Sequence, residues 1–247
     1  MNEEIIKVAP EVVKTTLPQL ANSVYQDLLS PAMKKAGQAL GNVIDFATLS
    51  FIPLEYVSAR IRMNIDKNLK NYQKKLDAVP ENEIRNVEPE IGVPIVEKLS
   101  YTTCEEIAEM YTTLLAKAST TATVNQAHPS FIQFLERMSV DEAKILKFLD
   151  GKVDFVCVRP KYYREENGGY IQIDGDITEL DDNVSLLFPQ NINSYIDNLC
   201  SIGVLMRKSG CYKIDEKLYE SVLKKGQSRI EAYKFCLLYT SDAADDK

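Results

Sequence analysis

The chain has 247 residues, with 29 basic and 36 acidic side chains and a formal net charge of −7. A mildly acidic protein is not a strong nucleic-acid binder as a whole, although a local basic face can still act. A single histidine excludes a metal site built from two or three imidazoles. Five cysteines without a Cys-x-x-Cys pair, and no secretory leader, predict reduced thiols in a cytoplasmic protein.

No apolar run approaches the ~20 residues that span a bilayer. The closest run, residues 40–54, contains Asp45 and Pro53. A helix that crosses the membrane is therefore not predicted, whereas a helix lying on the inner face of the membrane stays open.

The last twelve residues, 236–247, differ from the rest of the chain. Residues 236–246 match, one by one, the translation of a sequencing adapter, the transposon end used in fragment libraries. Artificial segments of this kind are set aside in fold reasoning. We expect residues 236–247 not to be native, and the natural protein to continue past Phe235.

The N-terminal region, residues 1–78, is predicted to be helical. Ser30-Pro31 is a typical helix start, because serine can cap and proline suits the first helical position. Gly37 and Gly41 then lie four residues apart on one strip of the helix. Small residues at this spacing predict a close contact with another helix or, alternatively, insertion or self-association at a membrane.

A second helix is predicted from Pro53 to about Leu76, with an apolar stripe and a basic face. A basic amphipathic helix can lie on anionic lipid or nucleic acid. The alternative is a solvated outer face whose lysine stems cover apolar surface. The candidate contact residues are Arg60, Arg62, Lys67, Lys70, Lys74 and Lys75.

The central region, residues 79–150, is predicted to be helical after a polar connection. Prolines in that connection discourage continuous helix, so helix is expected to resume only at Pro94. Further helices are predicted over residues 104–119, from the histidine onward, and over 140–149. Ser139 and Glu142 form a capping box for the last of these, and Gly151 ends it.

The only histidine starts the sequence His128-Pro129-Ser130-Phe131. Apart from Glu136, no carboxylate or cysteine lies within the next two turns. We therefore expect a structural motif, in which His128 bonds nearby backbone at a helix start and fixes the approach of Phe131 to the core. Ser130 has no activating partner other than this histidine. No catalytic residue, metal ligand or cofactor is predicted.

From Val153 the hydrophobic period changes, and residues 151–235 are predicted to form an α+β region. Short strands are expected over residues 153–157 and 170–173, around an Asn167-Gly168-Gly169 turn. A helix over residues 192–202 and a hairpin over 204–214 then resemble a winged helix. A final helix is expected to begin at Asp215 and to end at Gly226.

The predicted wing is poorly equipped to bind DNA. The helix that would enter the groove, residues 192–202, contains no Arg or Lys. Arg207 and Lys208 in the wing could contact phosphates, but two charges give little affinity. The acidic segment 174–183 lacks the glycine and glutamate that an EF-hand loop needs, so a solvated loop is expected.

Several blocks of the chain resemble the bacterial abortive infection alpha family. They are Pro80-Glu81-Asn82, Val87-Glu88-Pro89, Gly92-Val93-Pro94, Tyr101-Thr102, Met110-Tyr111, Leu114-Leu115-Ala116, Ala127-His128-Pro129-Ser130-Phe131 and Asp141-Glu142-Ala143-Lys144-Ile145-Leu146. The resemblance covers roughly residues 25–225. It implies a role in phage defence and supplies no catalytic residues.

Together these patterns predict a mainly α-helical protein, with a helical N-terminal part and a winged-helix-like α+β C-terminal part. The leading hypothesis is a non-enzymatic effector or sensor in phage defence. It would act through a protein partner, through self-association or at a membrane surface. A winged-helix DNA-binding regulator and a hydrolase with an unrecognised site stay open as alternatives.

Overall fold

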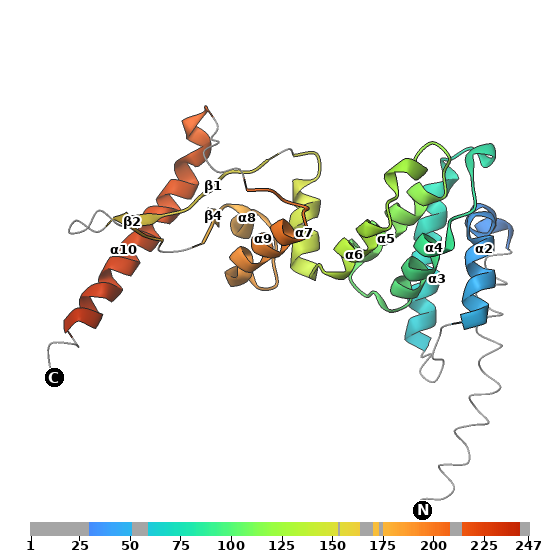
Figure 1. The fold of residues 1–247 in the computed structure, drawn as a ribbon, viewed down its shortest axis with the longest axis horizontal. Coiled ribbons are helices and arrows are strands. Elements are labelled where there is room, and N and C mark those ends of the chain that lie inside the picture. The colour runs from blue at the N-terminus through green and yellow to red at the C-terminus, as the bar shows by residue number, and fades with distance from the viewer. Residues whose placement is uncertain are drawn as a thin grey trace, which may run out of the picture. The chain divides into compact units, whose positions relative to one another are not determined.

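The computed structural model describes residues 30–50, 59–152, 154–163, 170–172, 175–207 and 214–242 (Figure 1). Contacts divide the chain into two compact units, one up to Arg137 and one from Met138. The boundary lies inside the region 79–150, because α6 packs on earlier helices whereas α7 packs on a later one. The described residues are mainly helical, as predicted, with two short pairs of strands.

The first unit is a bundle of helices. Its elements are η1 (Pro31–Met33), α2 (Lys34–Ser50), α3 (Ala59–Asp77), η3 (Glu81–Glu83), α4 (Pro89–Tyr101), α5 (Glu105–Ala118), η4 (Val124–Gln126) and α6 (Ser130–Glu136). Helices α3 and α4 pack on each other and on α2 and α5, and α6 packs on α4 and α5 (Figure 1). Their apolar stripes meet in a core that includes the fully buried side chains Tyr72, Leu76, Ile95, Leu99 and Leu115.

The first helix begins where predicted, and α3 ends close to its predicted end. Pro31 occupies the first position of η1, which continues directly into α2, although the Ser30 side chain makes no capping bond. Helix α3 ends at Asp77, one residue beyond the predicted end. Its predicted start, Pro53, lies outside the described residues.

Helix α4 begins at Pro89, five residues before the predicted start at Pro94. Proline is compatible with the first position of a helix, because the missing N–H has no partner there. Pro94 lies inside the helix, where its ring removes the hydrogen bond to the carbonyl of Glu90. The helix tolerates this loss because its buried face, Ile91, Ile95 and Leu99, continues on both sides of the proline.

The close contact between α2 and α4 depends on Gly92 rather than on the predicted glycines of α2. A Cβ atom at Gly92 would lie 2.3 Å from Cγ2 of Val43, a distance that real side chains do not allow. A Cβ atom at Gly41 would meet no described atom within 4 Å. The prediction that Gly41 marks a tight helix contact is therefore wrong, because no described atom lies close to where its side chain would be.

The second unit combines short helices and one long helix, α10, with two short antiparallel pairs of strands. Its elements are α7 (Val140–Leu149), β1 (Cys157–Val158), β2 (Lys161–Tyr163), β3 (Tyr170–Gln172), β4 (Ile177–Thr178), α8 (Leu180–Asn183), η5 (Pro189–Asn191), α9 (Ile192–Ser201), η6 (Glu216–Tyr219) and α10 (Glu220–Asp242). Strand β1 pairs with β4, with Cys157 opposite Thr178, and β2 pairs with β3, with Tyr162 opposite Ile171. Helix α7 packs on α9, and α10 packs on β1 and β4 (Figure 1).

The segment after α9 differs from the predicted strand. Gly203 adopts a φ of 79°, as a residue that ends a helix commonly does, and the N–H groups of Val204 and Leu205 donate to the Leu199 carbonyl. These amides cap α9, so residues 204–207 form no strand. Residues 208–213, which carry the predicted turn of the wing, and the 167–169 turn lie outside the described residues.

The final helix continues beyond its predicted end. Asp215 caps η6 by accepting from the N–H of Lys217, as expected for a helix start. Helix α10 then runs through Gly226 to Asp242, into the segment read as adapter translation. Gly226 is buried against Ile177 and Val158, so this glycine serves helix packing and does not stop the helix.

Candidate functional site

The first turn of α7 and its N-cap form a polar cluster with α9, which we call the α7 hub (Ser139, Asp141 and Glu142). Asp141 and Glu142 are buried in it. The predicted capping box is present: the Glu142 N–H donates to Ser139 Oγ at 3.3 Å, and the Ser139 N–H donates to Glu142 Oε2 at 2.5 Å. The other oxygen, Oε1, accepts from the side-chain amide of Asn198 at 2.7 Å. One buried carboxylate therefore caps α7 and also attaches α9 to it.

Asp141 holds the segment that leads into α9. Its Oδ1 accepts from the Leu187 N–H at 2.8 Å, and its Oδ2 accepts from the Phe188 N–H and the Tyr195 hydroxyl, both at 2.9 Å. Burial raises the pKa of the Asp141 carboxyl, but these hydrogen bonds and the nearby Lys144 ammonium outweigh burial and hold it below its ordinary value. The carboxylate is thus charged at neutral pH and fixes two consecutive backbone amides.

The two residues fixed by Asp141 expose large apolar side chains. Leu187 is 61% exposed and Phe188 is 54% exposed, although their amides are bonded to a carboxylate that is 2% exposed. We call Leu187 and Phe188 the apolar tip. Single exposed apolar residues are common on protein surfaces. An adjacent pair on a backbone held by a buried charge is already ordered, so a partner could bind it at a reduced entropic cost.

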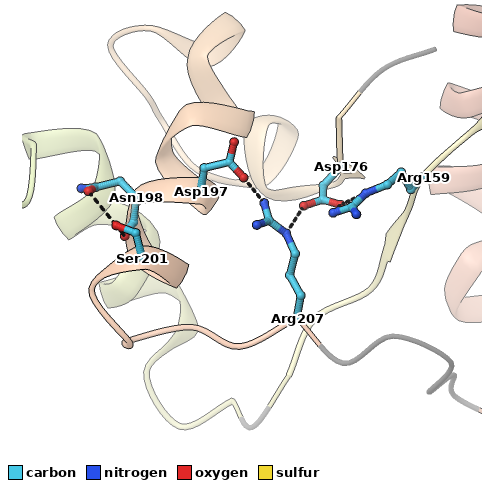
Figure 2. A network of polar contacts seen from close by, with 6 residues as sticks. All are labelled: Arg159, Asp176, Asp197, Asn198, Ser201 and Arg207. Carbon is cyan, nitrogen blue, oxygen red and sulfur yellow. Dashed lines mark hydrogen bonds and ion pairs between the residues drawn. The ribbon is translucent and has the colours of Figure 1, made fainter. Parts of the chain in front are cut away.

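A second network joins the β1–β4 ladder to α9 through four charged side chains (Figure 2). Asp176, which is 3% exposed, accepts from Arg159 through Nε at 2.9 Å and Nη2 at 2.6 Å. The other oxygen of Asp176 accepts from Arg207 Nε at 2.7 Å, and Arg207 Nη2 pairs with Asp197 of α9. Two cations and two anions balance each other, so the buried Asp176 carboxylate is fully compensated.

This network gives Arg207 a structural role in place of an open phosphate contact. Burial lowers the pKa of its guanidinium, but the bonds to Asp176 and Asp197 outweigh burial and raise the pKa overall. A phosphate would have to displace these two carboxylates from the guanidinium. The second predicted wing residue, Lys208, lies outside the described residues.

The acidic segment predicted to be a solvated loop is neutralised by cations from other elements. Besides the arginines on Asp176, Lys225 of α10 donates to Asp181 Oδ2 at 2.7 Å, Asp182 Oδ2 at 2.9 Å and the Thr178 carbonyl at 3.1 Å. These contacts attach α10 to β4 and α8. The expectation of a solvated loop is therefore wrong for Asp176 and Asp181, which are largely buried, whereas Asp182 is exposed and Asp174 lies outside the described residues.

The basic face of α3 is partly neutralised by α5. Lys67 pairs with Glu105, and Lys75 pairs with Glu109, both across the contact between the two helices. Carboxylates in the first turn of α5 also suit the positive end of that helix. Two of the predicted contact residues are thus engaged within the bundle.

The remaining basic residues of α3 have different surroundings. Lys70 and Lys74 are exposed, and within the described part of the chain neither has an ion-pair partner. Arg60 and Arg62 lie in the first turn of α3, and their side chains lie outside the described residues. Lys70 and Lys74 are therefore the described cations available for a surface contact on α3.

The histidine motif forms the start of α6. The Ser130 N–H donates to Nδ1 of His128 at 3.1 Å, and Ser130 Oγ lies 2.7 Å from the same nitrogen. This is the predicted backbone bond. Phe131, however, is 40% exposed and touches the histidine ring edge-on, while Ile132 and Leu135 fill the core. The predicted burial of Phe131 is wrong, because the phase of α6 turns positions 132 and 135 inward.

A groove with a volume of about 320 Å³ lies at the last turn of α7, and we call it the α7 groove. Its polar lining includes Lys152, Asp154 and Glu179, and the Lys152 ammonium lies 3.3 Å from the centroid of the Phe148 ring. Its apolar lining consists of Phe148, Leu149, Phe155, Val156, Leu180 and Leu218. The groove thus has polar and apolar lining in similar shares, with charged groups of both signs.

Metal and thiol chemistry find little support among the described residues. No group of three His, Cys, Asp or Glu side chains there could hold a metal ion. Burial is the main cause that raises the pKa of the Cys104 and Cys157 thiols, which disfavours their reactive thiolate forms.

No described helix has the length and apolar character needed to cross a membrane.

Sequence reasoning identified part of this site. The capping box located Glu142, and the family resemblance included Asp141, but no local signal marked Asp141 as buried. Local patterns do not reveal the burial of Asp176, because its partners, Arg159 and Arg207, are 17 and 31 residues away. The apolar tip could have been noticed only as two adjacent apolar residues before Pro189.

These features define an α-helical protein whose buried charges hold elements together and whose apolar side chains form exposed surfaces. A family model described as abortive infection alpha matches residues 62–241, which include both networks, the apolar tip and the α7 groove. The chain therefore belongs to the abortive infection alpha family. Membership indicates a role in abortive infection, a form of phage defence. No curated protein and no solved structure matches the chain.

Proposed function

We propose that this protein acts in phage defence as a non-enzymatic effector or sensor that works by protein contact. The observation that carries the proposal is the apolar tip, whose backbone is fixed by the buried Asp141 carboxylate while its side chains are exposed. The hydrogen bonds that compensate the buried Asp141 carboxylate also hold the backbone of the tip in one conformation. A preordered apolar pair is suited to docking into a partner.

The buried charges of the second unit also support a role without catalysis. Asp141 and Asp176 each accept hydrogen bonds from two or more groups outside their own element. Glu142 accepts from the N-cap of its own helix and from Asn198 of α9. Groups with this many partners are suited to holding structure, because a general acid or base needs access to its substrate.

The hydrolase alternative has one supporting observation, the 2.7 Å distance between Ser130 Oγ and His128 Nδ1. A nucleophile and its base lie at such a distance. Here, however, Nδ1 also accepts the Ser130 N–H, which is the bond that starts α6. The geometry is explained by the helix start, and we place this alternative second. Replacing Ser130 with Ala would leave phage restriction intact if the motif is structural.

The DNA-binding alternative is disfavoured by the charges around α9. Ser194, Asp197 and Ser201 are exposed on this helix, which has no Arg or Lys, and Arg207 is held by two carboxylates.

Contact with anionic lipid would instead use Lys70 and Lys74 of α3. Reversing both charges should then release the protein from anionic vesicles. If variant and wild type sediment equally with the vesicles, the protein does not bind lipid through Lys70 and Lys74.

The experiment that tests the proposal is phage plating on cells expressing the protein. The double variant Leu187→Ser/Phe188→Ser removes the apolar tip and keeps the backbone amides that bind Asp141. The matched control is Leu223→Ser, which removes an apolar side chain of similar exposure, 51%, from α10. We expect the tip variant to lose restriction and the control to keep it, with both folded by circular dichroism. Full restriction by a folded tip variant would refute the proposal.

A further inference from the structure

The backbone of the apolar tip offers a partner no free N–H group. The Leu187 and Phe188 amides both donate to Asp141. Pro189, the next residue, has no N–H. The Phe188 carbonyl is also engaged, because it accepts from the Asn191 amide at 3.0 Å. A partner that adds a β-strand needs free backbone donors and acceptors. Such a partner lacks its donors here, so the tip can be recognised only through its side chains.

The segment that carries the tip has no charged side chain. Residues 183–196 contain no Asp, Glu, Lys, Arg or His. The exposed residues that follow the tip, 189–191, are a proline and two amides. At the base of the tip, Asp141 is buried and lies 3.8 Å from the Lys144 ammonium, so these two charges offset each other. Ion pairing, which would select a charged partner, therefore has no donor or acceptor within this segment.

These properties favour a pocket in a protein over a lipid surface. One myristoyl chain gives only marginal membrane binding, and stable binding needs a second signal such as a basic cluster. Leu187 and Phe188 expose less apolar surface than a myristoyl chain, and residues 183–196 contain no Lys or Arg. A pocket, in contrast, can enclose both side chains and add close packing contacts around them.

We propose that the apolar tip docks into an uncharged, apolar pocket of a partner protein, and that this pocket excludes water. The proposal rests on the proposed function and deepens it by stating the chemistry of the partner surface. In such a pocket, a polar group without a hydrogen-bond partner weakens binding, whereas an apolar side chain of similar volume is tolerated better. The polarity of the side chain at position 187 therefore separates a dry pocket from a contact that stays open to water.

The first test compares two substitutions at this position by phage plating at equal expression. Leu187→Asn introduces an amide of similar size, and Leu187→Met keeps the side chain apolar. A dry pocket predicts that Leu187→Met restricts phages at least about tenfold more strongly than Leu187→Asn, because a buried unpaired polar group weakens binding by that factor. The control Leu223→Asn, at a side chain that is 51% exposed on α10, should restrict like the wild type.

Equal restriction by the two Leu187 variants would overturn the dry pocket. The proposed function is judged separately, by the loss of restriction in Leu187→Ser/Phe188→Ser. The inference about the pocket can therefore fail while the contact-based function stands. Melting curves of the purified variants check that each one folds.

The second test separates a protein partner from lipid and from other parts of this chain. The photoreactive residue p-benzoylphenylalanine replaces Gln190, which is exposed beside the tip, or Leu223 as the control, in full-length protein expressed in infected cells. Irradiation should join the chain to another protein from position 190 and not from position 223. Adding Leu187→Asn should weaken this adduct at least about tenfold. An adduct that Leu187→Asn leaves unchanged, adducts with lipid alone, cross-links within the chain alone, or no adduct would each overturn the proposal.

Discussion

At the scale of single residues, the second unit depends on carboxylates that are buried and yet fully bonded. Asp141 accepts three hydrogen bonds, two of them from backbone amides, and Asp176 is held by two guanidinium groups. Hydrogen bonds to a charged group contribute about 1.5–3 kcal/mol each, more than neutral ones. Removing a buried carboxylate leaves its donors unpaired, so we expect large effects from single changes.

Asp141→Ala should lower the free energy of unfolding of the protein by about 3 kcal/mol, because three donors lose their acceptor. The loss depends on pH. The folded pKa of Asp141 lies below its unfolded value of about 4, so its stabilisation is complete above that value and is lost as the pH falls through the folded pKa. Urea melts of wild type and variant at neutral and acid pH measure this. A difference that grows as the pH falls would contradict the assignment.

His128→Asn keeps a short polar side chain at the start of α6 and removes the titrating group. The free energy of unfolding should then fall by no more than about 1–2 kcal/mol, and phage restriction should persist. A denaturant melt beside a plating assay provides both readouts. If a normally folded His128→Asn protein lost restriction completely, His128 would instead be a functional residue.

At the scale of elements, two glycines of the first unit have opposite surroundings. Gly92→Ala should destabilise the bundle by about 1–3 kcal/mol, because the new methyl group would overlap Val43 of α2. Gly41→Ala should stabilise it by about 0.5–1 kcal/mol, because alanine is the better helix former and meets no described atom. Thermal melts of the two variants compare them directly. Equal effects of the two substitutions would be inconsistent with the α2–α4 contact described above.

Arg207 joins Asp197 of α9 to Asp176 beside β4, so Arg207→Gln should destabilise the second unit. We expect a loss of about 2 kcal/mol, less than the 3–5 kcal/mol for breaking a fully buried pair, because Arg159 still neutralises Asp176 and Arg207 is partly exposed. Lys217→Gln, at an exposed cation, is the matched control and should change stability by about 0.5 kcal/mol or less. Equal effects in chemical denaturation would remove the structural role of Arg207.

Local signals predicted local features well. The capping box at Ser139, the helix end at Gly151 and the apolar stripes of α3 and α5 follow from short-range rules, and the structure contains them. The predictions for the start of α4 and the end of α10 are wrong, because they treat Pro94 and Gly226 as helix ends. Both residues lie inside helices, where packing tolerates them. Tertiary contacts, which a local pattern does not contain, decided these two positions.

Local sequence patterns could not predict the polar networks around Asp141 and Asp176, for a similar reason. Asp176 binds arginines 17 and 31 residues away, and Asp141 binds amides 46 and 47 residues away. Hydrophobic periodicity carries no information about which distant polar groups will meet. The sequence therefore predicted the class of fold and the family, but it could not identify the charged pairs or the residues that they leave exposed.

At the scale of the whole molecule, family membership indicates phage defence, and the described residues offer surfaces for contact in both units. In the first unit these are Lys70 and Lys74 of α3, and in the second they are the apolar tip and the α7 groove. The proposed function assigns the main role to the tip, because its backbone is ordered before any partner binds. The buried charges then explain how exposed apolar residues are held in place.

The most direct measurement is the efficiency of phage plating on cells that express equal amounts of two folded variants. One is Leu187→Ser/Phe188→Ser, which removes the apolar tip, and the other is Ser130→Ala, which removes the hydroxyl beside His128. We predict that phages plate on the first strain as they do on cells without the protein, and that the second strain restricts them like the wild type. The reverse result, restriction without the tip and none without the Ser130 hydroxyl, would contradict a contact-based function and indicate catalysis.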